Sequence, residues 1–126
     1  MNYHDYHLRS YSVSDFGKTI TLDLVYDYPN SPKDESKIEF SEVVAYNFIH
    51  SGGAIILDIT ETPLSKISKE VEIDLINYAH QFGGTIIKFQ NGLELNKAML
   101  EKEGYKLWTI WSAIGFGGII IAKSVK

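Results

Sequence analysis

The sequence contains no cysteine, which excludes disulfide bonds, thiolate nucleophiles and zinc sites built on cysteine. Long apolar runs are also missing, because stretches such as Ile119–Ala122 are far shorter than the roughly 20 residues of a membrane-spanning helix. Residues Met1–His7 include neither a basic segment nor an apolar one, so we expect no signal peptide. Together these absences favour a reducing cytoplasmic location without contact to a membrane.

Known catalytic and phosphate-binding motifs are missing as well. The glycine clusters at residues 52–53 and 115–118 lack the Gly-x-x-x-x-Gly-Lys-Ser/Thr pattern, and no Gly-x-Ser-x-Gly string occurs. The four histidines, His4, His7, His50 and His80, are scattered along the chain, and the first two point to opposite faces if their segment is a strand. We therefore expect no catalytic residues, no cofactor and no metal, so that the protein is not an enzyme.

What the sequence does contain is the composition of one ordinary folded domain. Its 126 residues are 44% hydrophobic and 22% charged. A chain of this length and composition is expected to form one domain over residues 1–126, with a core that needs no disulfide bond or metal to stabilise it. The net charge is −4, which argues against a nucleic-acid partner. The segment from Asp15 to Glu61 contains nine acidic and three basic residues, a net charge of −6, whereas residues 62–126 carry a net charge of +2. The acidic first half suits a basic protein partner, and its alternative explanation is a solvated surface that maintains solubility.

Hydrophobic periodicity predicts strands in the first half. Residues 3–13 and 18–28 read as a hairpin around the turn Asp15-Phe16-Gly17-Lys18, and Ile20, Leu22, Leu24 and Tyr26 share one face of the second strand. Residues 29–36 form a loop with two prolines. Residues 37–50 follow as one bent strand or two short ones, Ser51-Gly52-Gly53 turns the chain, and residues 54–59 form a buried strand.

The second half predicts one or two helices between strands. Thr62 and Pro63 suit the start of an amphipathic helix that ends at Gly83, although Val71–Leu75 also alternates as a short strand. Residues 85–89 are extended, residues 93–103 form a shorter helix, and two strands around a glycine-rich connection complete the chain. The predicted fold class is α+β, a single mostly antiparallel sheet of about six or seven strands with one or two late helices packed on one face.

Both tryptophans lie in the last predicted strands. Trp108 and Trp111 have opposite strand parity, so one belongs to the core and the other is a candidate contact, unless both faces of the sheet are covered. Exposed aromatic side chains are favoured anchors at protein interfaces.

Two parts of the chain carry a family resemblance. Phe40-x-x-Val43-x-x-Tyr46-x-Phe48, followed by Ile56-x-Asp58-Ile59-x-Glu61, resembles the middle of a group of small bacterial proteins. Residues 105–122 are similar to that group's ending, "W-x-I-x-S-S-Y-G-L-x-G-x-V-x-A", with Ala113, Ile114 and Phe116 as the departures. Many members of the group look like immunity proteins, which neutralise a toxin domain in contact-dependent inhibition and related polymorphic toxin systems.

The resemblance implies an inhibitor that binds one cognate toxin and covers its active site, and many such toxins are basic nucleases. With the acidic first half, it leads us to expect a partner-binding surface formed by Asp23, Asp27, Asp34, Glu35, Glu39, Glu42, Asp58, Glu61 and Trp111. Two alternatives remain. One is a small enzyme or ligand-binding protein with a cavity under the sheet, and the other is a homo-oligomeric module that pairs through an exposed strand edge.

Overall fold

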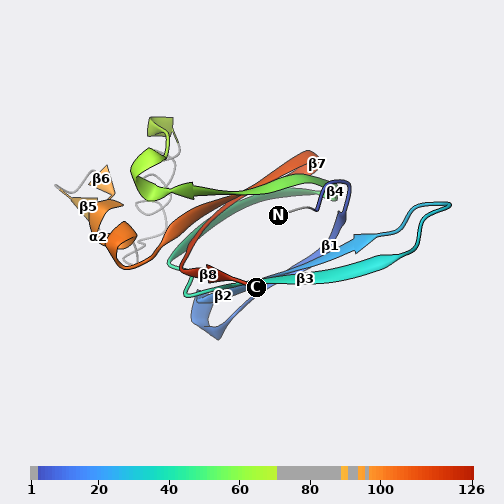
Figure 1. The fold of residues 1–126 in the computed structure, drawn as a ribbon, viewed down its shortest axis with the longest axis horizontal. Coiled ribbons are helices and arrows are strands. Elements are labelled where there is room, and N and C mark those ends of the chain that lie inside the picture. Colours follow the sequence, from blue (N-terminus) through green and yellow to red (C-terminus); the bar gives the residue numbers. More distant parts are fainter. Residues whose placement is uncertain (1–2, 71–88, 91–93, 96) are drawn as a thin grey trace.

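The fold is built from antiparallel strands. The computed structural model describes residues 3–70, 89–90, 94–95 and 97–126 (Figure 1). Six strands form one sheet in the order β7-β4-β1-β2-β3-β8, and β5 pairs with β6 separately. The strands are β1 (His7–Ser14), β2 (Thr19–Tyr26), β3 (Asp34–Ser41), β4 (Ala45–Pro63), β5 (Phe89–Gln90), β6 (Glu94–Leu95), β7 (Lys106–Ala122) and β8 (Ser124–Val125).

Strands β1, β2 and β3 form an antiparallel meander, as the sequence predicts for the first hairpin. In β2, the side chains of Ile20, Leu22 and Leu24 are fully buried, whereas those of Thr19, Thr21 and Asp23 are partly exposed. The alternation is therefore that of a strand with one face on the core. The predicted bend in residues 37–50 divides this stretch into two strands, because Glu42 adopts a left-handed backbone (φ 57°) between β3 and β4.

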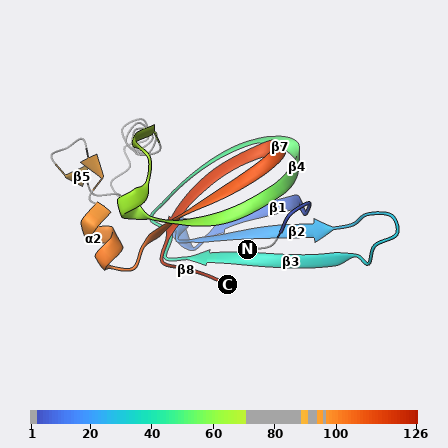
Figure 2. The same cartoon turned by 45° about the horizontal axis from the view of Figure 1, so that its top comes forward.

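Strands β4 and β7 pair along most of their length as a two-stranded ribbon. The ribbon runs outward and then folds back, so that each strand starts and ends on the same side of the molecule (Figures 1 and 2). The register shifts between the pairs His50–Phe116 and Ile55–Ile114, where Gly52, Gly53 and Gly115 have positive φ angles. This irregularity at glycine bends the ribbon, and the predicted turn at residues 51–53 becomes part of β4.

The β4–β7 ribbon is joined to the β1–β2–β3 meander at two places. The chain leaves β7 through Lys123 and enters β8, whose Val125 pairs with Phe40 of β3. At the other place, His7 of β1 pairs with Ile55 of β4, and the backbone N–H of Ile56 donates to the carbonyl of Tyr6. The meander and the ribbon therefore form two layers with a common interior.

That interior holds the main core. Its buried side chains come from both layers, and the edge-to-face pair of Phe40 and Trp108, with ring centroids 5.8 Å apart, joins β3 to β7. A second, smaller core forms where the 3-10 turn η2 (Leu64–Lys66) and the helix α2 (Lys97–Lys102) lie at the end of the ribbon. Leu64 and Leu100 pack there with Leu107 and Ile121.

The predicted α+β class is wrong, because the described chain is nearly all β. Thr62 and Pro63, taken as a helix start, instead end β4 as partners of Leu107 and Lys106, the 3-10 turn η2 follows, and helical residues begin only at Lys69 and Glu70. Pairing with β7 outweighs the local capping signal at this point. The remainder of the predicted helix, residues 71–83, the strand alternative at residues 71–75 and most of the segment 85–89 lie outside the described residues.

Two later boundaries also differ from prediction. The helix expected over residues 93–103 is the six-residue α2, since Glu94 and Leu95 belong to strand β6. The two final strands expected around a glycine-rich connection are one strand, β7, and the bend falls at Gly115 within it. The prediction that the tryptophans face opposite sides is confirmed, since Trp108 is 6% exposed and Trp111 is 55% exposed.

We predict that Gly115→Ala destabilises the fold while Gly117→Ala does not. A Cβ on Gly115 would lie 2.2 Å from the carbonyl oxygen of Gly52, and its φ of +81° disfavours any L side chain. The expected loss is on the order of 1–3 kcal/mol in the free energy of unfolding, measured by urea titration. Gly117 is the matched control, because a Cβ there meets no atom within 4 Å, and its variant should stay within about 0.5 kcal/mol of the parent. Equal stabilities of the two variants would contradict the importance of the Gly115 contact.

Candidate functional site

The structure distributes the expected partner-binding residues over three parts of the molecule. Asp23, Asp27, Asp34, Glu35 and Glu39 lie on the β2–β3 hairpin, Glu42 lies at the β3–β4 corner, and Asp58, Glu61 and Trp111 lie on the β4–β7 ribbon. The acids counted in the sequence therefore do not form one continuous surface.

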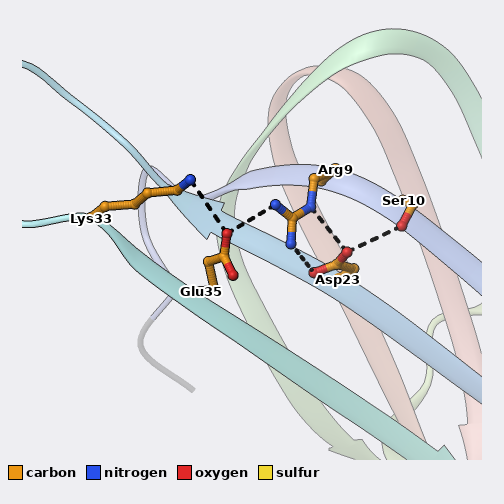
Figure 3. Close-up of polar contacts among 5 residues, drawn as sticks. All are labelled: Arg9, Ser10, Asp23, Lys33 and Glu35. Carbon is orange, nitrogen blue, oxygen red and sulfur yellow. Dashed lines mark hydrogen bonds and ion pairs between the residues drawn. The ribbon is translucent and has the colours of Figure 1, made fainter.

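On the hairpin, Arg9 draws two of the expected acids together (Figure 3). Its guanidinium donates from Nε and Nη2 to the two carboxylate oxygens of Asp23, at 3.0 and 3.1 Å, and from Nη1 to Glu35 at 3.1 Å. Lys33 approaches the same oxygen of Glu35 at 3.4 Å, and the Ser10 hydroxyl donates to Asp23. This forked arrangement is the strong form of an arginine–carboxylate contact.

The Arg9 network compensates part of the acidic charge. Its hydrogen bonds lower the pKa of Asp23 and the pKa of Glu35, because both stabilise the ionised carboxylate. Arg9 is the only arginine in the sequence. It reaches these partners from a bulge in β1, where the register with β2 shifts between Leu8 and Ser10. A bulge has no sequence signature here, so the pairing of Arg9 with Asp23 could not be predicted.

A cluster of tyrosines lies beside this network. Tyr6 contacts Tyr3 and Tyr26 with ring centroids 5.2 and 5.3 Å apart, and Tyr26 contacts Tyr28 at 4.7 Å. The Tyr6 hydroxyl donates to Asp34 at 2.5 Å, and this hydrogen bond to a carboxylate raises the pKa of Tyr6 to about 12. Asp34 is therefore committed to a contact within the chain, whereas Asp27 has no hydrogen bond or ion pair within the described chain.

On the ribbon, one face carries an uncovered group of polar and apolar side chains. We call Asp58, Thr60, Thr109, Trp111 and Ile114 the ribbon face. Trp111 pairs with Asp58 across the strands, and its indole N–H donates to the hydroxyl of Thr60 at 2.9 Å, which fixes the ring on the sheet. Ile114 follows on the same strand and is 58% exposed. The register with β4 shifts twice between Trp111 and Ile114, so the strand is irregular there, and both large apolar side chains stand in solvent.

Glu61 does not belong to the ribbon face. It lies three residues after Asp58, so strand alternation turns it to the opposite side of β4, and it forms an ion pair with Lys106 at 2.9 Å. Asp58 is exposed and has no ion pair within the described part of the chain. Of the three expected ribbon residues, the structure brings Asp58 and Trp111 together and separates Glu61 from them.

A hollow of about 170 Å³ lies at the corner where the β1–β2 turn meets the β3–β4 connection. Its lining residues come from both segments and from the residue before β7: Phe16, Gly17, Lys18, Glu42, Val43, Val44 and Tyr105. We call it the corner hollow. The sequence did not lead us to include Phe16 among the candidate contact residues. An aromatic residue within the turn Asp15-Phe16-Gly17-Lys18 is nevertheless a sequence signal for an exposed ring.

Three histidines lie apart from one another, as expected from their spacing. His4 contacts the Asp5 carboxylate, His7 stacks on Tyr28, and His50 packs against Tyr11 and Phe116, while His80 lies outside the described residues. Within residues 3–70 and the later described segments, no three His, Asp or Glu side chains converge in a way that could hold a metal ion. Nor does any described helix combine the length and apolar character needed to cross a lipid bilayer.

Comparison with known proteins gives no further assignment. No protein-family model matches the chain, and no curated protein matches it significantly. The functional interpretation therefore depends on the geometry of the surfaces described above.

We predict that Asp23→Asn lowers the thermal midpoint by a few degrees at pH 7 and by less at about pH 3. Because the folded-state pKa of Asp23 is lowered, its contribution is present above the unfolded-state value of about 4 and is lost as the pH falls through the folded-state pKa. Asp27→Asn is the matched control and should leave the midpoint unchanged at both pH values. Thermal unfolding followed by circular dichroism measures both variants, and a pH-independent effect of Asp23→Asn would contradict a charged contact.

Proposed function

We propose that this chain is a non-enzymatic, immunity-type binding protein that neutralises a basic toxin by covering its active site, and that it docks through the ribbon face. The observation that carries the proposal is the exposed Trp111, which pairs with Asp58 on an uncovered strand face, with the exposed Ile114 further along β7. The identity of the partner as a toxin derives from the family resemblance of residues 39–61 and 105–122.

The ribbon face has the composition of a protein-binding surface. Tryptophan is among the residues that contribute most to binding when a partner buries them, and exposed apolar side chains at the centre of a contact exclude water from it. The hydrogen bond from Trp111 to Thr60 supports this use, because a ring already held in place loses little conformational entropy when the partner arrives.

Charge provides a second line of support. Asp58 stands on the ribbon face with no ion pair within the described residues, and Asp27 is similarly uncompensated on the hairpin. The chain as a whole has a net charge of −4. A basic partner would be attracted during its approach, while the apolar contact would determine how long it stays bound.

The alternative of an enzyme or ligand-binding protein with a cavity under the sheet has less support. The space between the two layers holds the main core, with Ile20, Leu22 and Ile110 fully buried in it. The corner hollow, which the described residues do form, lies at the β3–β4 corner rather than within that core, although Val43 contributes to both.

We predict that Trp111→Ala weakens binding to the toxin encoded beside this protein by about 30-fold or more. That loss corresponds to about 2 kcal/mol, which is the threshold of a binding hot spot. Surface plasmon resonance with the purified toxin domain measures it, together with recovery of toxin activity. Phe16→Ala is the matched control, since Phe16 is an exposed aromatic residue on a different element, and it should leave the affinity for the toxin unchanged.

The charge contribution has its own test. Asp58→Lys should slow association with the toxin and flatten its dependence on salt, with a smaller effect on dissociation. Failure of the wild-type chain to bind or inhibit the neighbouring toxin would overturn the proposed function. Binding that is insensitive to Trp111→Ala and Asp58→Lys would remove the ribbon face as its site.

A further inference from the structure

The corner hollow combines an exposed aromatic side chain with an apolar depression next to it. Phe16 is 99% exposed, more than any other large apolar side chain of the described chain. A ring left in water lacks the stabilisation that its burial against apolar surface would give. The ring therefore stands where a partner could cover it.

The backbone under Phe16 holds the ring outward. Asp15 and Phe16 both have left-handed conformations, with φ angles of 53° and 56°, and Glu42 on the other side of the hollow has φ 57°. Such angles are unfavourable for side chains larger than glycine and concentrate at positions with a function. The hollow is also preformed, because the Val43 N–H donates to the Lys18 carbonyl at 2.9 Å and ties its two sides together.

The size of the corner hollow matches one aromatic ring. Its volume is about 170 Å³, and Phe16, Val43, Val44 and Tyr105 are among its lining residues. The hollow is open to solvent on one side, and its volume is similar to that of an enclosed apolar cavity of about 150 Å³ that binds benzene in another protein. A phenyl side chain is therefore a suitable occupant.

The hollow carries one positive and one negative side chain, so two copies of it can have complementary charges. Lys18 and Glu42 both border it, and within the described structure neither has an ion-pair partner. A surface with a protruding ring, a hollow of matching size and one charge of each sign can pair with its own copy about a two-fold axis. In such a dimer every contact occurs twice, once in each direction between the two copies.

From these features we propose that the corner hollow binds a second copy of this chain, in a weak symmetric dimer. Phe16 of each copy enters the corner hollow of the other, and Lys18 of each copy faces Glu42 of the other. One ring and one hollow per copy make a contact smaller than a standard interface, so the dimer forms at high protein concentration. The contact is separate from the ribbon face and does not depend on the proposed toxin.

Sedimentation velocity of the full chain, from about 10 μM to about 1 mM, tests the dimer. Wild-type protein should shift toward dimer as its concentration rises, and Phe16→Ser should raise the dissociation constant by at least about tenfold. The serine variant should fold normally, because the ring is exposed. Ile114→Ser is the matched control on the ribbon face and should dimerise as the wild type does. A wild-type chain that stays monomeric throughout, or a dimer lost in Ile114→Ser and retained in Phe16→Ser, would overturn the proposal.

A charge exchange between copies provides a second and independent measurement. Lys18→Glu and Glu42→Lys should each weaken self-association, because like charges then face each other across the axis. An equimolar mixture of the two variants should dimerise as the wild type does, since opposite charges meet again between unlike copies. Restoration on mixing supports contact between copies, whereas a mixture as weak as either variant alone would overturn the pairing of Lys18 with Glu42.

Discussion

The close approach of Gly115 to the carbonyl of Gly52 is the constraint on which the rest of the structure depends. It lets the β4–β7 ribbon fold back, which returns the end of β7 to the meander and allows β8 to pair with β3. The same bend leaves the earlier part of β7 with one face on the core and the other in solvent. Trp108 and Trp111 consequently serve different purposes, one filling the interior and one standing on the ribbon face.

The sequence alone predicts the regular strands well, because their information is local. The alternation of Ile20, Leu22 and Leu24 is sufficient to orient β2, and the parity of Trp108 and Trp111 is sufficient to place one of them in solvent. It fails at Thr62–Pro63, where the helix-start signal competes with pairing to residues more than 40 positions later. No local pattern carries that information, so the fold class is misjudged at this point.

The acidic surface shows the same limit for the candidate site. Nine acids between Asp15 and Glu61 predict a strongly negative surface, yet Arg9, Lys33 and Lys106 compensate three of them, and Tyr6 engages Asp34. Which acids stay uncompensated depends on a β1 bulge and on cross-strand registers, and neither follows from residue spacing. Composition therefore gives the sign of the surface, while topology determines where that charge is available to a partner.

The ribbon also determines how the chain reaches its native state. The β1–β2–β3 meander pairs segments that are close in sequence, whereas Ala45 pairs with Ile121 across most of the second half of the chain. Closing so long a loop has a high entropic cost before any contact offsets it, so we expect the meander to form first and the ribbon to join it last. Until that step, the face of the meander that is buried in the native state is exposed to water. The folding chain is therefore most prone to aggregate before the ribbon packs on the meander.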